Sequence, residues 1–197
     1  MAVVWSAFFT LIAPEAPGAA DIAIEAAACR AAIEFCTETG VNEKTLANIA
    51  TVQDQADYTI VAADEVVTRL LSVRLDTTRL EVLTPVQIDD LPYQVTAAQP
   101  WAAALTGPLA LRLLPAPPLA GQQIGIRAAM RPSQAATGLD DAVFERYAID
   151  IAAGAVARLV PERVDARLRF LDAIGKARVA VLRNHSRAES RARINWC

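Results

Sequence analysis

Apolar residues recur at helical spacing through most of the C-terminal third of the chain. Between Asp140 and Pro161 they fall at positions 144, 148, 151, 155 and 159, which is one face of an α-helix. Asp140 is placed to cap the free N–H groups at the start of this helix, and Pro161 ends the pattern. A second apolar series follows from Val164 and comprises Leu168, Leu171, Ile174, Val181 and Leu182. Because the link between the two series is short, we predict an antiparallel helical hairpin.

A further helix is predicted near the N-terminus, from Ala20 to Thr39, with Gly40 as its stop signal. Its apolar stripe consists of Ile22, Ala26, Cys29, Ile33 and Cys36. The cysteines form no CxxC motif, and we expect Cys29 and Cys36 to be reduced and buried. The preceding segment, Met1–Ala13, is apolar but too short to span a bilayer, and it lacks the basic start of a signal peptide. We expect it to pack on the core or on a neighbouring subunit.

From Val41 the pattern changes to an alternation with a period of two, which is typical of strands. Strands are predicted at 46–52, 58–61, 71–75, 80–83, 109–113 and 124–131, with a short helix after Thr84-Pro85, while residues 93–108 carry no clear pattern. We therefore predict an α+β fold: a helical bundle, made of the N-terminal helix plus the C-terminal helical hairpin, with an inserted small antiparallel β-sheet region. The whole chain is interpreted as a single domain. Its helical scaffold covers about 18–40 and 137–183, its β-rich insertion about 44–132, and its C-terminal arm about 184–197.

Composition and charge add two points to this picture. The 197 residues are 54% hydrophobic, and much of the excess is alanine, which suggests that some apolar surface is covered by partner subunits. The formal net charge of −3 is unevenly distributed. Residues 162–197 hold nine Lys or Arg and four Asp or Glu, a net charge of +5, so the preceding 161 residues carry −8. The chain is an acidic body with a basic C-terminal tail.

Chemistry-bearing patterns are scarce, and we predict no catalytic, cofactor-binding or metal-ligating residues. The one histidine, His185, lies in an Arg- and Ser-rich stretch, and no Cys/His/Asp/Glu spacing matches a metal site. The sequence contains no GxGxxG, GxxxxGK[ST] or GxSxG motif. The acidic pairs at 89–90 and 140–141 fit a turn or a helix end better than a pair of catalytic carboxylates. We therefore predict that the protein is not an enzyme.

The basic tail is the candidate binding element, and it has three interpretations. Its residues of interest are Arg183, Arg187, Arg191, Arg193, Ile194 and Trp196. As a nucleic-acid contact it lacks interleaved aromatic residues and adjoins an acidic body. As a partner-docking arm it combines positive charge with an apolar anchor at Ile194 and Trp196. As a solvated helix end its cations suit the negative end of the helix dipole.

Several short segments carry a family resemblance through their order and spacing. They are 14–18 (PEAPG) before an alanine-rich helix, 71–76 (LSVRLD), 83–85 (LTP), 111–117 (LRLLPAP), 127–133 (RAAMRPS), 137–140 (TGLD) and 144–147 (FERY). Together they resemble the head–tail adaptor (connector) proteins of tailed bacteriophages, over most of residues 14–183. The tail from Asn184 has no counterpart in this resemblance.

The resemblance implies a virion structural protein of the neck region, assembled in the host cytoplasm. It implies a ring, about twelve copies in that family, which docks beneath the portal protein, extends the DNA channel and offers a platform to tail or nozzle proteins. Genomic DNA would pass the lumen without sequence-specific binding. From the positive charge and the apolar anchor of the tail, and not from the resemblance, we predict that Arg183, Arg187, Arg191, Arg193, Ile194 and Trp196 dock on the portal. Two alternatives stay open. One is a small cytosolic binding or regulatory domain that contacts nucleic acid through its basic tail, and the other is an enzyme that works through residues outside the known motifs.

Overall fold

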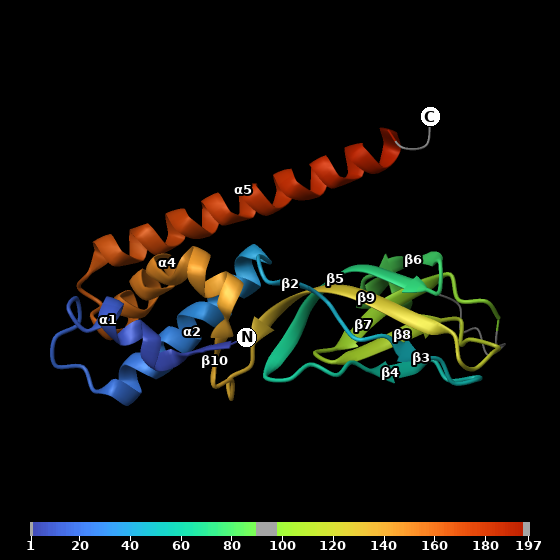
Figure 1. The fold of residues 1–197 in the computed structure, drawn as a ribbon, viewed down its shortest axis with the longest axis horizontal. Helices are drawn as coiled ribbons and strands as arrows, with labels where there is room; N and C mark the ends of the chain where they lie inside the picture. The colour runs from blue at the N-terminus through green and yellow to red at the C-terminus, as the bar shows by residue number, and fades with distance from the viewer. Residues whose placement is uncertain (1, 90–97, 195–197) are drawn as a thin grey trace. The chain divides into compact units, whose positions relative to one another are not determined.

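The computed structural model describes residues 2–89 and 98–194, except for the side chains of Asp89 and of 187–194. The chain divides into two compact units. Met1–Asn42 and Arg131–Cys197 form one, called here the helical unit, and Glu43–Met130 form the other, called the sheet unit. In Figure 1 the helical unit is coloured blue at its first part and orange to red at its second, whereas the sheet unit runs from cyan to yellow.

The helical unit joins the two ends of the chain. Its elements are β1 (Ala2–Val4), η1 (Trp5–Phe8), α1 (Phe9–Ile12), α2 (Asp21–Thr39), β10 (Gly138–Asp140), α4 (Asp141–Leu159) and α5 (Val164–Ile194). The predicted helix boundaries near 20, 39 and 159 are confirmed. Gly40 ends α2 in the left-handed conformation, with φ of 66°, and the Asp140 carboxylate accepts a hydrogen bond from Ala142 N at the start of α4.

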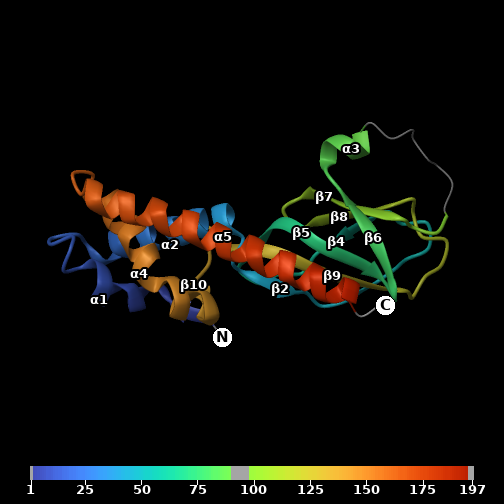
Figure 2. The same cartoon turned by 90° about the horizontal axis from the view of Figure 1, so that it is seen from above.

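The N-terminal segment packs on the core of its own unit. Trp5, Phe8 and Ile12 are buried there, and the Trp5 indole N–H donates to the Ala136 carbonyl oxygen at 2.6 Å. β1 pairs antiparallel with β10 beside them. Figure 2 shows α2, α4 and α5 lying along one another, and the aromatic rings of Phe35 and Phe170 meet between these helices with their centroids 6.1 Å apart.

The predicted apolar stripe of α2 is partly wrong. Cys29 and Cys36 are buried as expected, whereas Ile22 is 78% exposed. The buried positions of α2 also include several residues between the predicted ones, namely Ile24, Ala27, Ala28, Ala31, Ala32 and Phe35. The helix is covered by α4 on one side and by η1, α1 and α5 on others, so most of its circumference is buried instead of a single stripe.

The described residues of the sheet unit form eight paired strands and one short helix. They are β2 (Glu43–Thr45), β3 (Ile49–Ala50), β4 (Asp57–Thr59), β5 (Glu65–Leu75), β6 (Thr78–Leu83), α3 (Pro85–Asp89), β7 (Ala102–Gly107), β8 (Ala110–Leu114) and β9 (Gln123–Pro132). The order in the sheet is β2-β9-β5-β6-β7-β8-β4, and β3 also pairs with β9. The short helix predicted after Thr84-Pro85 is confirmed, and a capping box starts it: the Gln87 side-chain oxygen accepts from Thr84 N, and the Thr84 hydroxyl oxygen accepts from Gln87 N.

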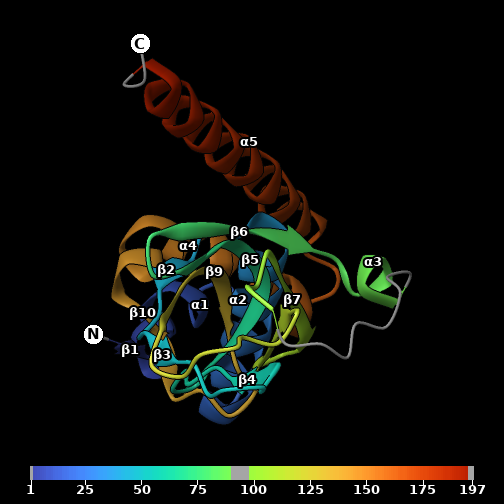
Figure 3. The same cartoon turned by 90° about the vertical axis from the view of Figure 1, so that its right-hand side faces the viewer.

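The sheet is curled, as Figure 3 shows from its end. Buried apolar side chains fill its interior. This interior takes side chains from nearly every strand, among them Tyr58, Val73, Leu80, Leu111, Ile124 and Met130. The outer face of β6, β7 and β8 carries a second small cluster in which Leu83, Ala102 and Ala104 lie against Ile88 of α3. β7 is therefore covered on both faces.

The predicted fold class, a helical bundle with an inserted small antiparallel sheet, is wrong. The protein is a mixed α+β protein dominated by the large curled eight-stranded sheet, with 30% of residues in strands and 41% in helices. The sheet is also not purely antiparallel, because β6 and β7 pair in parallel. β5 runs six residues further towards the N-terminus than predicted, and β7 was not predicted at all. The three consecutive buried alanines at 102–104 give no alternation from which β7 could have been recognised.

Candidate functional site

Five of the six predicted docking residues lie in the C-terminal part of helix α5. Arg183 is exposed on the described part of α5. Arg187, Arg191, Arg193 and Ile194 lie on the backbone of the same helix, but their side chains lie outside the described residues, as does the whole of Trp196. The helix continues without a break through 31 residues to Ile194, well past the end near 183 that the sequence predicts. The first eleven residues of the predicted arm are therefore helical.

Ion pairs fix the first turn of α5. Arg163 donates to the carboxylate of Glu15 at 2.8 Å and to that of Asp165 at 3.0 Å, and Arg169 donates to Glu15 at 3.1 Å. The hydrogen bond from Arg163 lowers the pKa of Asp165 to about 2, so this carboxylate is ionised at any working pH. The network ties the beginning of α5 to the turn between α1 and α2.

One face of α5 is packed inside the helical unit. Phe170 lies directly against the backbone of Gly154 in α4, where a Cβ would come within 2.6 Å of the Phe170 ring. The guanidinium of Arg158 covers the same ring at 5.7 Å. Ala166, Ala173, Ile174 and Ala177 complete the buried face. Further along, Arg178 donates to the backbone carbonyl of Glu38 at 2.6 Å and pairs with its carboxylate at the end of α2.

The opposite face of α5 is apolar and exposed. The α5 stripe, as we call it, consists of Val164, Leu168, Leu171, Val179 and Leu182. Leu168 is 61% exposed and Leu182 is 66% exposed. Gly175 lies in the same line, and a Cβ built on it would meet nothing within 4 Å. At 3.6 residues per turn, this line and the buried one lie on nearly opposite sides of the helix.

Sequence reasoning missed this surface. Leu168, Leu171 and Leu182 were placed on the packed side of the second helix, whereas alanines and Phe170 form that side. The signal was available, because two separate apolar series with steps of three and four run through Val164–Leu182. A helix that is apolar on two opposite faces is buried on both, either by its own chain or by a partner.

A groove of about 420 Å³ lies between α4 and α5, and most of the side chains that line it are charged. Alanines of α5 and Tyr147 form its floor, and Arg146, Asp150, Arg169, Asp172 and Lys176 line it. Burial raises the pKa of Asp150, and the hydrogen bond to Asp172 raises the pKa of Lys176. Serine, cysteine and histidine do not occur among the lining residues, so the groove offers no Ser–His or Cys–His pair.

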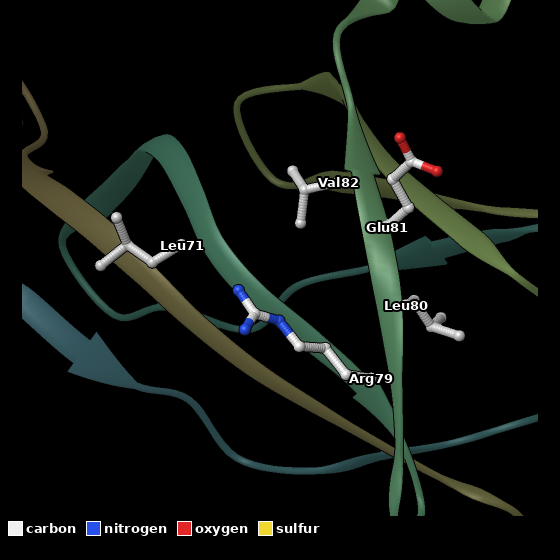
Figure 4. Close-up of a pocket in the computed structure, with 5 residues that line it drawn as sticks. All are labelled: Leu71, Arg79, Leu80, Glu81 and Val82. Carbon is white, nitrogen blue, oxygen red and sulfur yellow. The ribbon is translucent and has the colours of Figure 1, made fainter. Parts of the chain in front are cut away.

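A second hollow, of about 480 Å³, lies in the sheet unit where β6 changes partner (Figure 4). β6 pairs antiparallel with β5 up to Leu80 and in parallel with β7 from Glu81. The hollow opens beside this switch and is lined by Leu71, Arg79, Leu80, Glu81 and Val82. Figure 4 shows Arg79 reaching towards Leu71 while Glu81 points away. The wall is shallow and mixes apolar and charged groups.

Among residues 2–89 and 98–194 no group of three or more His, Cys, Asp or Glu side chains is arranged to hold a metal ion. Within that same part of the chain, none of the helices is both long and apolar enough to cross a membrane. The chain matches no model of a known protein family and no curated protein.

Proposed function

We propose that this chain is a virion structural protein, a head–tail adaptor that docks on the portal protein through the C-terminal part of α5. Two lines of support come from the sequence. The segments at 127–133, 137–140 and 144–147 resemble the adaptor family, and the basic tail contrasts with an acidic body of net charge −8. The observation that carries the docking role is the extension of α5 beyond the helices on which it packs.

The extension is long and positively charged. At 1.5 Å per residue, the 31 residues of α5 span about 46 Å, whereas the 19 residues of α4 span about 28 Å. From Val179 to Ser186 every described side chain of α5 is exposed or half-buried. Residues 183–194 contain four arginines and one glutamate, a net charge of +3.

An acidic partner would stabilise this extension. Arginines at 183, 187 and 191 follow one another at intervals of four, and like charges at this spacing destabilise a helix. A short, polar helix is also marginal in water unless something else stabilises it. Carboxylates on a partner surface would pair with the arginines and stabilise the helix. In the proposed assembly the partner is the portal, and further copies of this chain complete a ring of about twelve above the tail proteins.

The proposed ring has a consistent relation to DNA. An acidic body repels phosphates, so genomic DNA would pass the lumen without sequence-specific binding. Repetition around the ring adds avidity, because each docked tail raises the local concentration of the next. Weak single contacts would then be sufficient for stable attachment in the neck of the virion.

The test is a truncation that removes residues 184–197. Because the buried side chains from Ala166 to Ala177 and the ion pair of Arg178, which hold α5 on its own unit, all precede residue 184, we expect the shortened protein to keep its helical circular-dichroism spectrum and its melting temperature. Mixed with portal rings from the same phage, it should fail to decorate them in negative-stain electron microscopy, whereas the full chain should form a second ring.

A matched control separates charge from length. Replacing Arg183, Arg187, Arg191 and Arg193 by lysine preserves the charge and should retain attachment, whereas replacement by glutamine should abolish it. Normal decoration of portal rings by the truncated protein would overturn the proposal. Sub-micromolar, salt-sensitive binding of duplex DNA that disappears with the truncation would instead favour the nucleic-acid interpretation.

A further inference from the structure

Apart from Val164, the α5 stripe is symmetrical about Gly175. Leu171 and Val179 stand four residues before and after this glycine, and Leu168 and Leu182 stand seven residues before and after it. If two copies of α5 pack antiparallel with their glycines together, Leu168 of one copy therefore meets Leu182 of the other. Leu171 meets Val179 in the same way. The steps of three and four are those by which apolar side chains of paired helices interlock.

No close contact in the described part of the chain requires a glycine at position 175. A glycine inside a helix is less favourable than an alanine, and nothing within 4 Å would obstruct a Cβ at this position. Gly154 differs, because Phe170 packs directly on its backbone. The missing side chain at 175 is explained if another backbone approaches the helix at the centre of the stripe.

Charges along one edge of the stripe are complementary in the same arrangement. At 3.6 residues per turn, Asp165, Asp172, Lys176 and Arg183 all lie on one side of the stripe. A two-fold antiparallel pair places this edge against the same edge of the other copy in reverse order. Asp165 then lies close to Arg183 of the other copy, and Asp172 close to Lys176. A parallel pair would instead bring the two arginine-rich helix ends side by side.

We propose that the free protein is a two-fold dimer in which the α5 stripes of two copies pack antiparallel, crossing at Gly175. This goes beyond the proposed adaptor role, because it concerns the protein before it meets any portal. The stripe fits a second copy of this chain because its pattern and its flanking charges complement themselves. Burial of six leucines, four valines and two glycines from the two copies provides the apolar contact.

The first test is the mass of the full chain in solution. Sedimentation equilibrium of the unaltered protein should give a dimer that dissociates on dilution. Leu168→Glu should weaken the dimer at least tenfold, and the 61% exposure of this side chain means that the monomer fold tolerates the change. Ile149→Glu is the matched control, since Ile149 is 74% exposed on α4 outside the stripe, and it should leave the dimer unchanged. Gly175→Ala should weaken the dimer about fivefold or more without loss of helix content.

The second test determines the orientation. In a Cys197→Ser background, Leu168→Cys and Leu182→Cys proteins are oxidised separately and as a mixture. The antiparallel arrangement predicts a disulfide-linked species in the mixture only, because identical positions seven residues from the centre lie about 21 Å apart, beyond disulfide reach. Cross-linking of each variant with itself would show a parallel pair and overturn the proposal.

Other results would also overturn it. A protein that stays monomeric up to about 100 µM, or an oligomer that Leu168→Glu and Ile149→Glu affect equally, would show that the stripe does not join two copies. These outcomes are independent of the portal assay, since a monomer can still decorate portal rings and a dimer can fail to do so. Failure of the dimer and failure of the adaptor role are therefore distinguishable.

Discussion

Two glycines inside the helices of one unit provide a sharp test of the packing, and Gly154→Ala is the informative change. A Cβ at this position would lie 2.6 Å from Cδ2 and Cε2 of Phe170 and 3.0 Å from its Cγ. Carbon atoms in good contact are about 3.5–4.0 Å apart, so the ring must move by about 1 Å. Phe170 is buried, and its ring also packs on Phe35 and under Arg158, so the movement disturbs three contacts.

The magnitude follows from two opposing effects. Overpacking of a buried site costs about 1–3 kcal/mol, whereas replacing glycine by alanine inside a helix contributes about 1 kcal/mol. We expect Gly154→Ala to lower the free energy of unfolding by about 1 kcal/mol, and by about 2 kcal/mol at most. The matched control is Gly175→Ala, where a Cβ meets nothing, and where we expect stabilisation by about 0.5–1 kcal/mol.

The assay is thermal unfolding followed by circular dichroism at 222 nm, in protein dilute enough to be monomeric. For a chain of this length, 1 kcal/mol corresponds to about 2–4 °C, so the two variants should melt on opposite sides of the unaltered protein. Phe170→Leu should cost less stability in the Gly154→Ala background than alone, because a smaller side chain relieves the overlap. A Gly154→Ala protein that melts as high as the Gly175→Ala protein would refute the close packing of α4 on α5.

Two further predictions concern the same unit. Ile151→Ala should lower the free energy of unfolding by about 2–5 kcal/mol because Ile151 is fully buried, whereas Phe144→Ala should lower it less because Phe144 is half-buried. Denaturant titration measures both changes, and equal losses of stability would contradict the assigned face. In a Cys197→Ser background, Cys29 and Cys36 should resist a thiol reagent at pH 8, because both are buried and burial raises the pKa of Cys29. Rapid native-state labelling would show that the core opens.

Local signals were sufficient to predict most of the helical unit. Asp140, Gly40 and Pro161 act on the backbone within one turn, so the boundaries of α2 and α4 could be placed from the sequence. Which side of each helix is buried could not be predicted in the same way. Alanine-rich helices give weak stripes, and Ile22 was assigned to the core although Ile24 and Phe35 occupy it. Only the positions of the neighbouring helices decide which side of such a helix is covered.

The sheet was underestimated for a different reason. Alternation with a period of two arises only where one face of a strand is buried and the other is wet. β7 has both faces covered at Ala102–Ala104, and it pairs in parallel with β6 although 18 residues separate the two strands. Pairings of this kind depend on tertiary contacts that a linear pattern does not record. The sequence therefore indicated strands without indicating that they form one large sheet.

The two candidate surfaces, the basic tail and the α5 stripe, also differ in how far the sequence predicts them. The charge of the tail was visible in the sequence, because a count of arginines needs no structure. The α5 stripe was not assigned, since its leucines have the same spacing as core residues. Phe170, Ala173 and Ala177 had to be seen packed before Leu168 and Leu182 could be recognised as exposed.

The nesting of the two units has a consequence for how the chain folds during synthesis. Glu43 pairs with Ala129, so the sheet unit cannot close until 86 further residues have been added after β2 begins. The helical unit closes later still, because Trp5 bonds to Ala136, and α2 packs on α4 and α5. Contacts this distant in sequence are slow to form, since long loops must close first. During synthesis the sheet unit is therefore complete first and folds first. The apolar side chains of the first 42 residues stay uncovered until the last two helices have been made.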